Sequence, residues 1–313
     1  MSTIVFLLDA HGVSYHFYAD DSQLYICIDD TEYAKIKVVQ LLKDIRRWMC
    51  ERKLKLNDRK TEIMLVRGNL RGDEAEEFGN LDLGDFQLTP VPHAKNLGVL
   101  FDSALNFKNH VNSLVRSCNF HIRNLYAVRR FMQKENIMSL VHSLILSKVD
   151  YCNSLFIGLP NVTLKKIQSV MNRAAHLITQ LPPRVSITPT LIDLHWLPVR
   201  ARIEYKICLI TFKALKFHQP KYICDLLTPL AREHDIVLRS TGDPFRLWEP
   251  RAPRERNFAN RSFSYVAPRM YNRLPVAIKQ LESLDCFKKH LKTHFFNLSY
   301  DFTNHTVSEM YKV

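Results

Sequence analysis

The sequence predicts an α+β fold in which short strands and one helix come first and a mainly helical region follows. β-branched and aromatic residues dominate residues 13–18 and 23–28, a pattern typical of two strands joined by a tight turn. Beyond Asn106 the apolar residues recur at helical spacing over several long stretches. We therefore expect a strand-containing segment of about 100 residues, followed by helical segments.

The composition is that of a folded protein with a basic surface. The chain has 313 residues, of which 46% are hydrophobic and 24% charged, and it lacks repeats and low-complexity tracts. This is enough for a sizeable core and for one large or two modest domains. Lys and Arg number 44 against 31 Asp and Glu, which gives a net charge of +13. Such a balance favours a polyanion such as nucleic acid as partner, although solvated lysine-rich helix faces produce the same charge.

Cysteine usage and hydropathy indicate an intracellular protein without a membrane anchor. The seven cysteines are scattered and never form a Cys-x-x-Cys pair. This pattern suggests neither a disulfide framework nor a zinc site, and it fits a reducing compartment. The opening residues lack a basic leader, and no stretch reaches the length of a membrane span. Nucleus and cytoplasm are both compatible with these features.

The first hundred residues contain the expected strands and one long helix. Asp20 and Asp21 lie at the tip between the first two strands. Asp29, with Glu32, is expected to cap the helix that follows. The apolar face of this helix is predicted to consist of Tyr33, Ile36, Val39, Leu42, Ile45 and Met49.

A turn and two further segments follow this helix. Residues 57–60 are predicted to form a turn before a short strand at 62–65. An acidic surface loop is expected at 71–80, and a small hairpin within 81–102.

The remainder of the chain is predicted to be mainly helical. Helices are expected around residues 111–125, 137–145, 164–178 and 195–217, and a final one at 283–298. Pro198 and Pro220 suit helix starts. Between residues 239 and 273, eight Arg face three acids, with aromatic residues interleaved and no clear period. We interpret that stretch as an irregular arm.

The two adjacent carboxylates are the strongest chemical signal in the sequence. Asp20 and Asp21 on a rigid tip repel each other unless a cation lies opposite. A divalent metal such as Mg²⁺ is the obvious candidate, because it takes one or two protein carboxylates and completes its shell with phosphate oxygens. Taken alone, the pair is better explained by the turn propensity and solubility of aspartate, and it is the neighbouring segments that favour the metal site.

Three segments in fixed order resemble a known enzyme family. YADD (18–21), LNDRKTE (56–62) and KNLGVLFD (95–102) resemble motif C, motif D and the primer-grip region of reverse transcriptases of LINE-type, non-LTR, jockey-like retrotransposons. The segments YCNSLFIGLP (151–160), LIDLHWLPVRARIEYKI (191–207), FKAL (212–215) and YVAPRMYNRLP (265–275) look like the parts that follow the polymerase core in the same elements. The resemblance covers nearly the whole chain.

The resemblance implies both an architecture and partners. Residues 1–104 would be a partial palm, 105–182 a helical thumb, and 183–313 a mainly helical C-terminal region that contains the Arg-rich arm at about 239–273. The parent enzyme would be an RNA-directed DNA polymerase that uses Mg²⁺, an RNA template, a DNA primer and deoxynucleoside triphosphates. No membrane partner is implied.

By the same resemblance, particular residues acquire roles. Asp20 and Asp21 would bind the catalytic metal. Lys60 would match the motif D lysine and could protonate the departing pyrophosphate; a solvated turn lysine is the other interpretation. Gly98 would let the backbone approach the primer strand closely, or would serve packing alone.

Basic side chains of the helical half are the candidate nucleic-acid contacts. They are Arg116, Arg123, Arg129 and Arg130 in the thumb-like segment and Arg251, Arg254 and Arg256 in the arm. Phosphate contact and base stacking are one interpretation. A solvated helix face, or docking of the arm on acids of the protein itself, is the other. His195 and Trp196 are shared with the resembled family, but they indicate packing and no chemistry.

The catalytic set is expected to be incomplete in this chain. A reverse-transcriptase palm needs a third carboxylate from motif A, on a separate strand. Asp9 is the sole acid before the tip and does not lie in such a motif. We therefore expect a polymerase by descent that is inactive alone. A non-catalytic RNA- or DNA-binding module and a non-functional retroelement relic are the alternatives.

Overall fold

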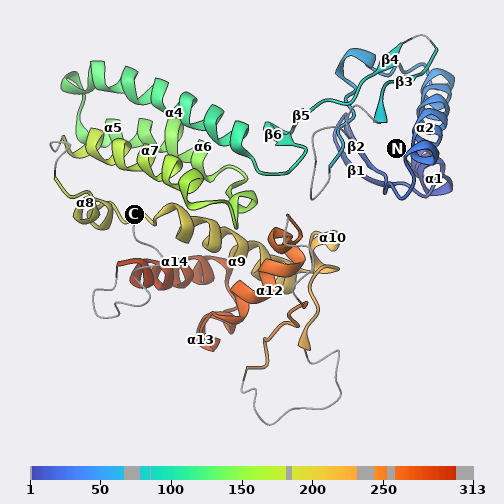
Figure 1. The fold of residues 1–313 in the computed structure, drawn as a ribbon. Helices are drawn as coiled ribbons and strands as arrows, with labels where there is room; N and C mark the ends of the chain where they lie inside the picture. Colours follow the sequence, from blue (N-terminus) through green and yellow to red (C-terminus); the bar gives the residue numbers. More distant parts are fainter. Residues whose placement is uncertain are drawn as a thin grey trace. The chain divides into compact units, whose positions relative to one another are not determined.

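The computed structural model describes residues 2–66, 78–84, 86–180, 185–230, 243–251 and 258–300. The chain divides into two compact units, Met1–Leu105 and Asn106–Val313, and each is described by itself (Figure 1). Helices are combined with two-stranded antiparallel sheets, all of which lie in the first unit within the described residues. The predicted α+β class is confirmed.

The first unit is organised around an antiparallel hairpin. Strands β1 (Ser14–Tyr18) and β2 (Asp21–Tyr25) pair in a register that places Tyr18 opposite Asp21. Ala19 and Asp20 form the two-residue turn, and Ala19 has a positive φ of 54°. The predicted strand pair is confirmed, although the second strand begins two residues earlier than expected and includes Asp21.

One face of the hairpin packs on two helices. Tyr15, Phe17 and Leu24 contact a cluster formed by α1 (Ser2–Ala10) and α2 (Thr31–Glu51). Leu8 of α1 and Leu41 of α2 are almost fully buried in this cluster. Since side chains alternate along a strand, the opposite hairpin face is left for polar and aromatic residues.

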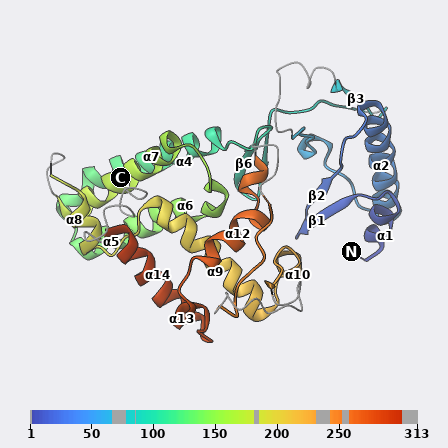
Figure 2. The ribbon, with the colours of Figure 1, turned by 60° about the horizontal axis from the view of Figure 1, so that its bottom comes forward.

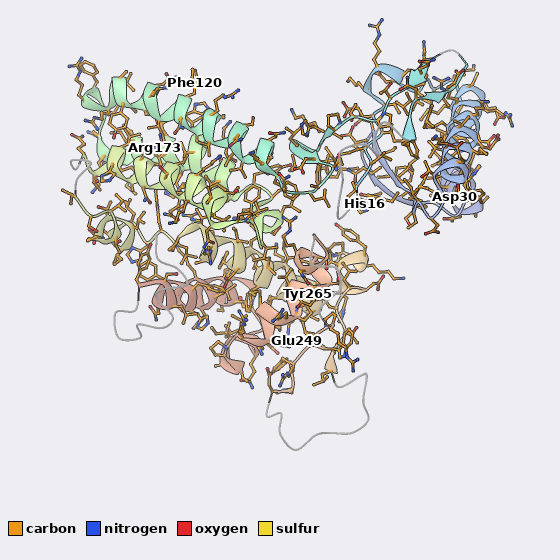
Figure 3. All side chains as sticks on the ribbon, in the orientation of Figure 1. His16, Asp30, Phe120, Arg173, Glu249 and Tyr265 are labelled. Carbon is orange, nitrogen blue, oxygen red and sulfur yellow. The ribbon has the colours of Figure 1, made fainter. Side chains whose placement is uncertain are left out.

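Helix α2 differs from the sequence prediction in two details. Its cap is Asp30, whose side chain accepts a hydrogen bond of 2.8 Å from the Tyr33 amide, so the prediction of Asp29 is wrong by one residue (Figure 3). Tyr33 and Ile36 are each 68% exposed. The predicted apolar face is wrong at these positions because α2 buries a different stripe, which contacts two clusters: Ala34, Val38, Leu41, Leu42 and Ile45.

Short elements complete the first unit. A 3₁₀ turn η1 (Asp58–Lys60) precedes Ile63, which forms a single parallel bridge to Pro90, so the strand expected at 62–65 is reduced to that bridge. The hairpin expected within 81–102 is instead two hairpins: β3 (Leu81–Asp82) with β4 (Gln87–Leu88), and β5 (His93–Asn96) with β6 (Val99–Asp102). The expected acidic loop lies mostly outside the described residues, but Phe78 is 1% exposed and belongs to the core.

The second unit is mainly helical within its described residues, with an isolated antiparallel bridge between Pro229 and Leu247 (Figures 1 and 2). Its elements are α4 (Lys108–Val128), η2 (Arg129–Phe131), α5 (Lys134–Val141), η3 (His142–Leu146), α6 (Ser147–Asp150), η4 (Asn153–Phe156), α7 (Asn161–Thr179), α8 (Thr188–Asp193), α9 (Val199–Phe217), α10 (Lys221–Cys224), η5 (Phe258–Arg261), α12 (Phe263–Asn272), α13 (Val276–Lys279) and α14 (Leu284–Tyr300). The long helices expected from apolar spacing are present.

Helices α4 and α7 pack side by side, and α9 packs against both α12 and α14. The core between the helices is dense. Phe287 of α14 stacks on Phe212 of α9 with ring centroids 3.7 Å apart. Other side chains with almost no exposed surface are Ile137, Ile145, Phe156, Ile167, Met171, Leu177, Ile178 and Leu191. This core holds α4 and α7 in place and so orients the side chains on their outer faces.

The prediction of an irregular arm at 239–273 is wrong at its C-terminal end, because Phe263–Asn272 is helix α12. Pro268 lies inside this helix, and a proline in a helical pattern normally indicates a break. The helix forms because Val266, Ala267 and Tyr271 are buried in the unit. None of the described helices has the length and apolar character needed to cross a membrane.

Candidate nucleic-acid interface

The tip of the β1–β2 hairpin carries the two predicted metal-binding carboxylates. Asp20 lies in the turn and Asp21 is the first residue of β2, and both are exposed. Asp21 pairs with Tyr18 across the hairpin, so Asp21, Tyr18 and His16 lie on the same outer face. Tyr18 is 64% exposed. The outer face therefore presents aromatic and polar groups beside the acidic tip.

Asp9, the other acid that precedes the tip in the sequence, interacts with the packed face of the hairpin. Burial and the Asp9 carboxylate, which accepts a hydrogen bond from the Tyr15 hydroxyl, raise the pKa of Tyr15. Tyr15 belongs to the packed face of the hairpin, whereas Asp21 belongs to the outer face. Asp9 thus serves the attachment of α1 to the hairpin.

The donor chemistry of the tip fits Mg²⁺ only in part. Two adjacent carboxylates are oxygen ligands of the kind that Mg²⁺ prefers. Among the described residues, no group of three or more His, Cys, Asp or Glu side chains could hold a metal ion. Asp20 and Asp21 would therefore hold the metal together with ligands from elsewhere, and no transfer step follows from the described residues alone.

A cavity of about 200 Å³ lies beside β2. Its walls are Leu24 and Ile26 on the hairpin side, Ala34 and Val38 on α2, and residues 61–65 on the far side. Within the described residues, β2 pairs with β1 alone. The cavity is thus bounded by the packed face of β2, by residues 61–65 and by helix α2, which lies between them in sequence.

Lys60 and Gly98 lie in two different turns of the first unit. Lys60 is exposed in η1, a turn that the 2.6 Å ion pair between Arg46 and Asp58 holds against α2. Gly98 follows Leu97 in the two-residue turn between β5 and β6, with φ of 83° and 44° respectively. Tight hairpin turns favour positive φ, so this geometry accounts for the glycine.

An open groove of about 620 Å³ lies between α4 and α7. It is lined by Asn112, Val115, Arg116, Asn119, Ile122, Arg123 and Tyr126 of α4 and by Arg173 of α7 (Figure 3). The polar positions on α4 recur every three or four residues, so they form one stripe along the helix. Two of the predicted nucleic-acid contacts, Arg116 and Arg123, are therefore brought together with an arginine 50 residues or more away in the sequence.

The groove is positively charged, and none of the described residues that line it is an acid. Neither α4 nor α7 contains an Asp or a Glu. Within the described part of the chain, Arg116, Arg123 and Arg173 form no ion pair, and Arg173 donates only to the Ser169 carbonyl at 3.2 Å. All three side chains are exposed. Their charges are thus available to an anion.

Polar amides line the same groove. Lys166 of α7 donates to Asn112 Oδ1 at 2.9 Å. Asn119 Oδ1 is buried and has no hydrogen-bond partner among the residues that the structure describes. A buried acceptor of this kind is normally satisfied by a ligand or by ordered water.

The other predicted basic residues are distributed over the surface. Arg129 lies over the Tyr126 ring, 4.4 Å from its centroid, and Arg130 lies over Phe131 at 5.1 Å. Both flank the C-terminal end of α4 and do not line the groove. Arg251 is exposed, while Arg254 and Arg256 lie outside the described residues.

An arginine beyond the predicted set binds an acid of the protein itself. Arg269 of α12 donates to the Tyr265 hydroxyl at 2.5 Å and lies 4.0 Å from Glu249 (Figure 3). Asn272 holds the segment around Glu249 in place: its Oδ1 accepts from the Leu247 amide at 2.9 Å, and its Nδ2 donates to Glu249 at 2.9 Å. Part of the Arg-rich region is therefore used in packing.

Sequence reasoning missed Arg173 and the two asparagines of the groove. The signal that could have found them is the shared lack of acids in residues 108–128 and 161–179, in a chain with 31 acids. Comparison with known proteins gave no match to a family model, to a curated protein or to a solved structure. The resemblance to reverse transcriptases stays a prediction from the sequence.

Proposed function

We propose that this chain is a reverse-transcriptase-like polypeptide whose helical unit binds the sugar–phosphate backbone of nucleic acid in the groove between α4 and α7. The main support for this proposal is the groove itself. Three arginines that form no ion pair with the described residues converge there from two helices that contain no acid. The motif order in the sequence supports a template–primer duplex as the nucleic acid.

The groove matches what backbone recognition requires. Arginine and amide side chains supply the donors that contact phosphate and sugar oxygens. Arg116 and Arg123 lie seven residues apart, about 10 Å along the helix axis, so they can contact separate phosphates. Each neutralised phosphate releases condensed counterions, which makes the predicted affinity strongly dependent on salt.

The test is fluorescence anisotropy with a labelled RNA–DNA hybrid. We expect wild-type protein to bind and the double variant Arg116→Ala/Arg123→Ala to bind at least tenfold more weakly. The matched control is Lys288→Ala/Lys289→Ala, which removes two charges from α14 outside the groove and should have a smaller effect. Equal losses in the two double variants would show that general positive charge, and not the groove, binds the hybrid.

A second candidate function is nucleotidyl transfer at the hairpin tip, favoured by the exposed carboxylates of Asp20 and Asp21 beside the aromatic outer face. When bound there, Mg²⁺ ions would stabilise the attacking and leaving oxygens of phosphoryl transfer. The chain's own residues would hold the metal at the tip. The resemblance implies that the third carboxylate of the metal site comes from motif A of the parent enzyme.

We expect the isolated chain to bind template and primer through the groove but not to extend the primer, because its catalytic set is incomplete. Primer extension on an RNA template with Mg²⁺ tests it, with Asp20→Ala as the comparison. We expect no product from either protein. Extension by the wild-type chain that Asp20→Ala abolishes would contradict the proposed inactivity and would establish the tip as a working catalytic site.

A further inference from the structure

A second pocket of the helical unit, of about 270 Å³, shares no residue with the groove. Its walls come from η3, the start of η4, residues 194–197, α9 and α14. The η3 segment, His142–Leu146, is π-helical. Such turns interrupt regular helices at a cost and occur frequently at functional sites.

The pocket contains a buried acceptor without a partner. Asn153 is only 3% exposed and lines the pocket. Its amide nitrogen donates to Asp150 Oδ1 at 3.3 Å, while its Oδ1 is buried and has no hydrogen-bond partner among the described residues. An unsatisfied buried acceptor costs about 1–3 kcal/mol. A ligand that offers an N–H or O–H group would remove this cost.

The charges of the pocket favour an anion. Its one acid, Asp150, is neutralised by Arg202 at 2.7 Å, and Arg202 also donates to the Leu197 carbonyl at 2.9 Å. Lys206 and Lys292 line the same pocket and form no ion pair within the described part of the chain. Two lysines are therefore left with their charge available to a ligand.

The remaining wall is aromatic and apolar. Trp196 is 3% exposed and makes an edge-to-face contact with His142, with ring centroids 5.8 Å apart. Burial, and then the charges of Arg202 and Lys292, lower the pKa of His142. The imidazole is thus neutral at pH 7 and extends the aromatic wall. Tyr205 and Leu194 continue it.

We propose that this pocket binds a mononucleotide. The phosphate would contact Lys206 and Lys292, and the base would lie along the aromatic wall with an N–H group donated to Asn153 Oδ1. A volume of about 270 Å³ lies just below the range of about 300–1,000 Å³ for small-molecule sites, so it suits a base with its phosphate at the open edge. The nucleotide is either free or the terminal residue of a single strand.

Calorimetric titration with AMP, adenosine and inorganic phosphate tests the assignment. We expect AMP to bind about tenfold or more tightly than either part alone, because charged and neutral hydrogen bonds both contribute. Lys292→Met should weaken AMP binding about tenfold. Lys289→Met, an exposed lysine of the same helix outside the pocket, should leave it unchanged. Phosphate binding as tight as that of AMP would overturn the proposal.

Asn153→Leu separates binding from folding. It removes the unpartnered acceptor, so we expect weaker AMP binding without a loss of thermal stability. Lys206→Met, on a half-buried lysine of α9, provides a second variant should Asn153→Leu fold poorly. AMP binding that persists unchanged in Lys206→Met and Lys292→Met contradicts the site.

Competition identifies the source of the nucleotide. A 5′-phosphorylated single strand that displaces AMP, where the unphosphorylated strand does not, assigns the terminal nucleotide. Failure of both strands to displace AMP assigns the free mononucleotide. These results do not depend on the α4–α7 groove, because Arg116→Ala/Arg123→Ala should leave AMP binding intact.

Discussion

The hairpin unit and the helical unit differ in how their cores are built. The first unit rests on small clusters between two helices and two-stranded sheets. The second packs long helices against one another and buries large side chains such as Phe156 and Phe287 almost completely. The difference teaches that the acidic tip lies on short paired strands, whereas the basic groove lies on long packed helices.

The largest expected effect is at a buried ion pair of the helical unit. The Lys279 side chain is fully buried and pairs with Asp243, and it also donates to the Asn272 carbonyl at 3.3 Å. Lys279→Met leaves the largely buried carboxylate uncompensated, so the free energy of unfolding should fall by about 3–5 kcal/mol. Urea unfolding followed by circular dichroism measures it. Lys289→Met, which removes an exposed charge, should stay within about 0.5 kcal/mol of wild type.

Matched leucines compare the two scaffolds directly. Leu177 is 0% exposed in the helical core, and Leu41 is 1% exposed but lines the cavity beside β2. Leu→Ala costs about 2–5 kcal/mol in cores, and the cost grows with the contacts that are lost. We expect Leu177→Ala to be the more damaging of the two. Hydrogen exchange of the α7 and α2 amides measures the loss of local stability in each variant. A larger loss of stability in Leu41→Ala than in Leu177→Ala would mean that the first unit is packed at least as tightly as the second.

The pH dependence of stability should come mainly from the helical unit. Burial lowers the pKa of His110, whose ring lies 5.8 Å from that of Phe156, and burial also lowers the pKa values of His142 and His294. The unfolded chain therefore binds protons more readily below its ordinary histidine pKa of 6.5. Stability is unaffected at high pH and is lost as the pH falls below that value.

Thermal melts at pH 7.5 and 5.5 measure this loss. We expect a lower Tm at pH 5.5, with a smaller difference in His110→Leu because one of the three histidines with a lowered pKa no longer titrates. An identical pH difference in wild type and His110→Leu would show that His110 has the same pKa in the folded and the unfolded state, and so that burial does not lower it.

The smallest effect on stability is expected at the tip. Asp20 and Asp21 are exposed, so Asp20→Asn/Asp21→Asn should change the free energy of unfolding by less than about 0.5 kcal/mol. The same urea titration provides the value. A destabilisation above that range would mean that the two carboxylates hold the hairpin together and are not kept for a ligand.

The sequence was sufficient to predict an element where its local pattern of residues was strong. The aromatic strands around YADD predicted the tip, and the apolar spacing of Val111, Leu114, Cys118, Ile122 and Leu125 predicted α4. Helix α12 was missed because residues 239–273 show no clear apolar period, while burial of Tyr271 and its neighbours decides the outcome. The groove could not be predicted from one segment, since Arg173 meets Arg116 and Arg123 only after α7 packs on α4.

The salt dependence of hybrid binding tests the central claim most directly. The slope of log affinity against log salt should fall by about two in Arg116→Ala/Arg123→Ala, one for each phosphate contact that is lost. It should be unchanged in Asp20→Asn/Asp21→Asn. A slope that is the same in wild type and in the arginine double variant would contradict the account, because the groove between α4 and α7 would then make no contact with the backbone.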